Sequence, residues 1–120
     1  MSFPQSVSVT ATTDGSGDAT VYTDNIRGRI IAVRYVKPAS GSYTDGVDFT
    51  ITTETTARNV WVDTNVNASE TVVPKELNDG TDGADLTGVY DHVRAFNERV
   101  KIVVGSGGAS KVGTFTVFFE

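Results

Sequence analysis

The sequence contains no cysteine and only one histidine, His92. Without cysteine there can be no disulfide framework and no thiolate metal ligand, and one histidine cannot form a multi-histidine metal site. A Ser-His-Asp triad would depend on His92, but the chain has no G-x-S-x-G motif around a serine nucleophile. We therefore predict that the protein is not an enzyme and needs no cofactor, and we interpret His92 as a solvated or hydrogen-bonding side chain.

Long apolar runs and an excess of basic residues are also missing. No window approaches the ~20 apolar residues that span a bilayer, and the first six residues, M-S-F-P-Q-S, lack the basic and apolar regions of a signal peptide. The formal net charge is -5, whereas binding to a phosphate backbone normally relies on a basic stripe. These features predict that neither a membrane nor a nucleic acid is a partner.

The residues that are abundant favour β-structure. With 120 residues, 38% hydrophobic content and no break in composition, the chain fits a single domain over residues 1–120. Near the end of the chain, residues 99–104 and 114–119 are rich in β-branched and aromatic residues and flank a glycine-rich segment, which is typical of two strands and a turn. We expect a closing hairpin. Its alternating apolar residues are predicted to lie in the core: Val100, Ile102, Val104, Phe115, Val117 and Phe119.

Other segments show the same alternation. Residues 6–13 and 19–23 flank a turn rich in Asp and Gly and are expected to pair as a hairpin. Residues 27–37 form the longest strand candidate, and the apolar run at residues 30–33 within it indicates a central position. A helix is the less favoured alternative, because Ile, Val and Tyr are restricted in helices. Further strands are expected at residues 47–53, 59–63, 70–73 and 89–96.

For residues 89–96, the alternative to a strand is one or two helical turns. The polar stretch at residues 75–88 is expected to be a loop. About eight short strands separated by Gly, Asp and Asn predict an all-β fold, either an antiparallel β-sandwich or a small barrel.

Two loops carry residue types that bind ions in other proteins. The segment N-D-G-T-D-G-A-D at residues 78–85 offers the oxygen ligands that calcium prefers, but its spacing does not match an EF-hand loop. The segment G-S-G-G-A-S-K at residues 105–111 offers glycine amides and a lysine, but it precedes a strand and lacks the spacing of a phosphate-binding loop. We interpret the first as a solvated loop, with a calcium site as the alternative, and the second as a flexible hairpin loop.

Charge is unevenly distributed along the chain. Residues 27–37 carry a run of basic side chains, whereas residues 76–91 are acidic. This asymmetry has two interpretations: ion pairs or solvated faces within one fold, or complementary docking between subunits. Trp61 has a similar pair of interpretations, and we favour a core position over an interface.

Three segments of the chain resemble small, all-β structural proteins of tailed bacteriophages and prophages. They are G-R-I-I-A-V-R-Y-V-K at residues 28–37, D-F-T-I-T-T-E-T-T at 48–56, and N-E-R-V-K-I-V-V-G-S-G-G-A-S-K-V-G-T-F-T-V at 97–117. The resemblance implies a virion component, in particular a capsid decoration or cement protein that binds the major capsid protein on the outside of the head. It also implies synthesis in the host cytoplasm and a homo-oligomer.

The predicted partner interface has two parts. Residues 1–5, with Phe3 and Pro4, are expected to form an extended N-terminal segment that can add a strand to the sheet edge of a neighbour. The basic residues Arg27, Arg29 and Arg34 are the second part.

Two other functions remain open at this point. One is a tail, connector or head-fibre component, which the sequence does not separate from a decoration protein. The other is a carbohydrate or cell-surface binding module, with Trp61, Tyr43 or Tyr90 as stacking platforms and calcium in the acidic loop.

Overall fold

The structure is a computed structural model that describes residues 3–120, and these residues form eleven β-strands and no helix. The all-β prediction is therefore confirmed, with more strands than the eight expected. No helix in residues 3–120 is long and apolar enough to cross a membrane. The strands, in chain order, are β1 (Gln5–Thr12), β2 (Ala19–Tyr22), β3 (Ile26–Val36), β4 (Val47–Thr53), β5 (Asn59–Val66), β6 (Glu70–Val72), β7 (Lys75–Asp79), β8 (Asp85–His92), β9 (Arg94–Glu98), β10 (Val100–Gly105) and β11 (Val112–Phe119).

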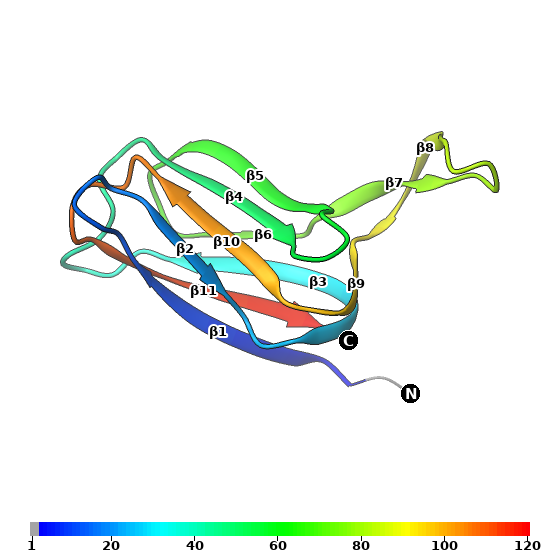
Figure 1. Cartoon of the computed structure of the whole chain (residues 1–120), viewed down its shortest axis with the longest axis horizontal. Helices are drawn as coiled ribbons and strands as arrows, with labels where there is room; N and C mark the ends of the chain where they lie inside the picture. Colours follow the sequence, from blue (N-terminus) through cyan, green and yellow to red (C-terminus); the bar gives the residue numbers. More distant parts are fainter. Residues whose placement is uncertain (1–2) are drawn as a thin grey trace.

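Two sheets pack face to face as a sandwich, and a separate ribbon extends from one end (Figure 1). Sheet A has the order β1-β11-β3-β6, with β9 also paired to β3, and sheet B has the order β2-β10-β4-β5. Every pair of named strands is antiparallel, and β7 pairs only with β8. The predicted antiparallel β-sandwich is the observed architecture.

The expected closing hairpin is wrong, although both of its strands exist. β10 pairs with β2 and β4 in sheet B, whereas β11 pairs with β1 and β3 in sheet A. Residues 106–111 therefore connect the two sheets instead of turning within one. The predicted core residues of both strands are buried, because the apolar face of β10 lies against that of β11 across the sandwich. Alternation marks an apolar face equally well whether the second strand lies beside the first or opposite it.

The expected hairpin of the first two strands is wrong for the same reason. β1 lies at the edge of sheet A and β2 at the edge of sheet B. The two connections between the sheets bind each other: Gly107 N–H donates to the Gly17 carbonyl at 2.9 Å, and Thr13 N–H donates to the Lys111 carbonyl at 2.8 Å. Backbone hydrogen bonds between the two connecting loops thus hold the sheets together at this end of the sandwich.

The core is built around a cluster of aromatic rings. Phe49 lies at the centre, with ring centroids 4.8 Å from Tyr35, 4.9 Å from Phe115 and 5.3 Å from Trp61. Trp61 is buried, which confirms its predicted core position. Tyr43, from the loop between β3 and β4, also lies in the cluster and donates its hydroxyl to a backbone carbonyl at 2.6 Å.

The central position expected for residues 27–37 is confirmed. β3 lies between β11 and β6 in sheet A, and its far end also pairs with β9. Gly28 has a φ of +106° at a shift in the β3–β9 register, and a Cβ there would collide with the Glu120 carbonyl. Only glycine fits this position without moving the end of the chain.

The loop expected at residues 75–88 is wrong. Most of it belongs to β7 and β8, which form a two-stranded ribbon that projects beyond the sandwich (Figure 1). A ribbon that lies outside the core needs few apolar side chains, so the apolar alternation that predicts strands is weak here. The strand expected at residues 89–96 is divided between β8 and β9, and its helical alternative is wrong.

Candidate functional site

The ribbon of β7 and β8, residues 75–92 with its turn, pairs within itself and projects beyond the sandwich; we call it the arm. It leaves the sandwich at the end where β1 begins and β11 ends (Figure 1). Three of its apolar side chains are exposed to solvent: Leu86 by 42%, Val89 by 44% and Tyr90 by 62%. The fold itself does not cover these side chains, so they are available to a partner.

The tip of the arm is a tight turn made by the acidic segment. Gly80 N–H donates to the Ala84 carbonyl at 2.8 Å, and Gly83, with a φ of +82°, donates to the Gly80 carbonyl at 2.9 Å. The Asp82 carboxylate accepts the Ala84 N–H at 3.1 Å, so it is used within the turn. Nowhere in residues 3–120 do three or more His, Asp or Glu side chains gather closely enough to hold a metal ion.

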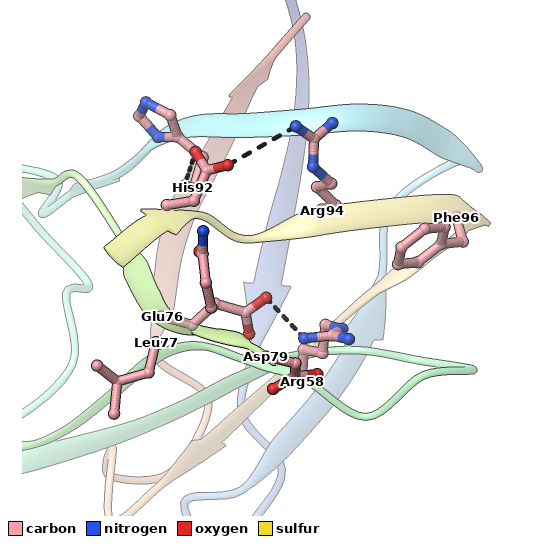
Figure 2. A pocket seen from close by; sticks show the side chains of 9 residues that line it. Arg58, Glu76, Leu77, Asp79, His92, Arg94 and Phe96 are labelled. Carbon is pink, nitrogen blue, oxygen red and sulfur yellow. Dashed lines mark hydrogen bonds and ion pairs between the residues drawn. The ribbon is translucent and has the colours of Figure 1, made fainter. Parts of the chain in front are cut away.

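A polar cleft of about 240 Å³ lies where the arm meets the sandwich (Figure 2). Side chains from β7, from β8 and β9, and from the turn before β5 line it. The lining residues are Arg58, Glu76, Leu77, Asn78, Asp79, Asp91, His92, Arg94 and Phe96.

An ion pair across this cleft joins the arm to sheet B. Arg58, just before β5, donates Nη1–H to Glu76 Oε1 of β7 at 2.6 Å, and Figure 2 shows the two side chains pointing toward each other. The hydrogen bond and charge of Glu76 raise the pKa of Arg58 above its usual value. The Arg58 guanidinium also lies 6.0 Å from the centre of the Phe96 ring. This turn therefore holds both β7 and β9 in place.

On the opposite wall, Asp91 and Arg94 form a looser pair at 3.8 Å. The N–H of His92 donates to Asp91 at 2.7 Å and is the main reason that the pKa of this carboxyl is lowered. The positive charge of Arg94 lowers this pKa further, and so does that of Arg29, which lies opposite Arg94 in the β3–β9 register. His92 Nδ1 is buried and has no hydrogen-bond partner within residues 3–120.

Glu98 is a buried carboxylate that joins β9 to the turn before β5, next to the base of the arm. It accepts the N–H groups of Thr55, Thr56 and Phe96 at 2.8 to 2.9 Å, and the Thr56 hydroxyl at 3.0 Å. Burial raises the pKa of Glu98, but these four donors outweigh burial and leave the pKa below its usual value. Sequence reasoning misses Glu98, because a single glutamate between the strands expected at residues 89–96 and 99–104 looks like an ordinary solvated charge.

The predicted partner residues lie in the segment before β1 and along β3. Phe3 and Pro4 precede β1, and Phe3 is 70% exposed. Arg27 and Arg34 are exposed, and the side chain of Arg34 stands in register with Thr116 of β11 in sheet A. Arg29 forms an ion pair with Glu120 at the end of the chain.

The basic strand and the acidic segment each form ion pairs with other parts of the chain. Lys37 pairs with Asp45 at 3.5 Å, while Glu76 in the acidic segment pairs with Arg58. Among residues 3–120, no ion pair joins residues 27–37 to residues 76–91.

Two of the three proposed stacking platforms are inside the protein. Tyr43 and Trp61 are buried in the aromatic core, so neither can stack on a sugar ring. Tyr90 is exposed and belongs to the arm.

Comparison with known proteins gives the fold only. No family model matches the chain, and no curated protein matches it. A solved structure, described as the crystal structure of FLHE, is similar with a TM-score of 0.50 and 12% sequence identity, over 99% of this chain and 99% of that chain. At this identity the similarity concerns the architecture and does not extend to function.

Proposed function

We propose that the protein is a decoration protein of a tailed bacteriophage, which docks on the outer surface of the capsid and stabilises the head through its arm. The observation that carries the proposal is the projecting arm with exposed Leu86, Val89 and Tyr90. The resemblance of residues 28–37, 48–56 and 97–117 to phage structural proteins supplies the class of partner, the major capsid protein.

The geometry of the arm suits docking on a protein surface. A ribbon of two strands can lie in a groove or along a sheet edge of the partner, and its backbone and apolar side chains then both contribute to binding. The aspartates around the tip, Asp79, Asp82 and Asp85, favour a basic patch on the partner, which would orient the arm during encounter.

The rest of the fold acts as a rigid mount for the arm. Glu98 and the Arg58–Glu76 ion pair fix the base of the arm against the sandwich. A fixed arm loses little conformational entropy on docking. Many copies bound to a repeating lattice can then reinforce it, although each contact is modest. The same arm could attach a tail, connector or head-fibre subunit, and the location on the virion separates these alternatives.

Co-sedimentation with empty capsids tests the proposal. The capsids come from a tailed phage whose genome encodes this chain. We expect the wild-type protein to pellet with them and Val89→Asp to bind at least about tenfold more weakly, a loss of about 1.4 kcal/mol, because a charge replaces an apolar contact.

Val62→Asp is the matched control. Val62 is 55% exposed on β5, which is not part of the arm, and the substitution introduces the same charge. It should bind as the wild type does. Equal binding by Val89→Asp and the wild type, or an equal loss in both variants, would reject the arm as the docking element, and no pelleting of the wild type would reject the proposed function.

A further inference from the structure

β1 is a long strand at the edge of sheet A. It pairs with β11 in an unbroken register from Gln5 opposite Phe119 to Thr12 opposite Val112. Within residues 3–120, no strand pairs with the other edge of β1. Within this eight-residue strand, every second residue therefore directs its backbone N–H and C=O away from β11, where no described strand accepts them.

The other edges of the sandwich are short, irregular or charged. β2 has four residues and β6 has three, and β5 pairs with β4 through two register shifts and carries Asp63. Such features normally prevent edges from joining. β1 has none of them, since its sequence, Q-S-V-S-V-T-A-T, contains no charge and no proline, and its register contains no bulge.

The pattern of side chains on β1 is self-complementary. If a second β1 runs antiparallel to the first with Ser8 opposite Ser8, then Ser6 lies opposite Thr10 and Val7 opposite Val9. Hydroxyl pairs of this kind already occur between β1 and β11, where Ser8 Oγ lies 2.8 Å from Thr116 Oγ1. Directly opposed pairs of like character stabilise neighbouring strands.

The core-facing side of β1 and the net charge of the chain both favour a second copy of this chain as the partner of β1. Val7 and Val9 pack against the core but remain only half-buried at this edge, and a second copy would cover them further. Each chain has a net charge of -5, so two copies repel each other least along a surface without charged residues.

We propose that two copies of this chain pair through β1 about a two-fold axis and join their A sheets into one continuous sheet. The contact is isologous, so it closes as a dimer and does not propagate. This inference does not depend on capsid binding, because it concerns the free protein and a different surface from the arm.

Mass measurement in solution over a concentration series tests the dimer. Wild-type protein should have the mass of two chains. Ser8→Lys should have the mass of one chain, because the two-fold axis sets the two lysines directly opposite each other. Thr50→Lys, at an exposed position on β4 in sheet B, is the matched control and should remain a dimer.

A mixture of Ser8→Lys and Ser8→Glu distinguishes this register from a general effect of charge. Each variant alone should be monomeric, and their mixture should recover the dimer mass through opposite charges across the axis. Hydrogen exchange of the wild type gives an independent measurement that needs no variant: the β1 amides that do not pair with β11 should become protected as the dimer forms. A monomeric wild type, a dimeric Ser8→Lys, or β1 amides without added protection would overturn the proposal.

Discussion

At the scale of single residues, Glu98 shows how burial and function can be linked. Its carboxylate lies inside the protein, where an unpaired charge would be costly, and four donors satisfy it. Those donors belong to the turn that carries Arg58 and to the strand that carries Phe96, which both line the cleft at the base of the arm. Glu98 therefore has a positioning role: it places the side chains that hold the arm.

Glu98→Gln should destabilise the protein by about 1–3 kcal/mol at neutral pH, since an amide replaces an ionised acceptor and directs an NH₂ group at N–H donors. Because the folded-state pKa is lowered, ionised Glu98 contributes stability above its unfolded pKa of about 4.3, and this contribution is lost as pH falls through the folded value. The difference between wild type and variant should therefore shrink below about pH 4.

Urea unfolding at neutral and acidic pH measures both quantities. Glu54→Gln is a useful comparison, because Glu54 also accepts an arginine hydrogen bond but lies in an exposed pair with Arg99. It should change stability much less. A difference between wild type and Glu98→Gln that stays constant from neutral to acidic pH would contradict the role assigned to this carboxylate.

Residue types alone predict the core well. Val47, Phe49 and Ile51 are buried as their alternation indicates, and so are the apolar residues of β10 and β11. Glu98 and the interior position of Tyr43 are not predicted, because both depend on partners that are distant in the sequence. A loop tyrosine and an isolated glutamate have the same local appearance whether they are buried or solvated.

At the scale of elements, strand positions can be predicted and strand partners cannot. The periodicity of two identifies β3, β4, β10 and β11 within a few residues. It does not say that residues 106–111 cross from one sheet to the other, because an apolar face is buried equally well by an adjacent strand and by an opposed sheet. The arm is missed because it is held by its turn and by backbone pairing instead of core packing.

The contact between the loop of residues 37–46 and β11 provides a test of packing between elements. Tyr43 stacks over Tyr35 at 6.0 Å between ring centroids, directly above Gly113. A Cβ at Gly113 would lie 2.5 Å from Tyr43 and 2.8 Å from Tyr35, so both rings would have to move. Gly113→Ala should destabilise the protein by about 1–3 kcal/mol, as overpacked cores do.

Gly15→Ala is the control for this substitution. Nothing among the described residues lies within 4 Å of a Cβ at Gly15, so the change should shift stability by no more than about 0.5 kcal/mol. Thermal unfolding of the two variants should separate them clearly. Equal stability would mean that Tyr43 is not held against β11 as described.

At the scale of the whole molecule, the arm and the β1 edge divide the surface into two separate contact regions. The arm extends from the end of the sandwich at which the chain terminates, while β1 runs along the side of sheet A (Figure 1). A dimer through β1 would leave both arms free. Two arms on one dimer could then engage neighbouring capsomers, so that each dimer bridges the lattice and binds more tightly than one chain.

Electron cryomicroscopy of capsids incubated with the wild-type protein tests docking through the arm most directly. We expect added density on the outer surface of the head, repeated with the symmetry of the lattice, into which the sandwich fits with residues 75–92 against the major capsid protein. Density confined to the tail or connector, or sandwich density whose arm points away from the capsid, would contradict the account.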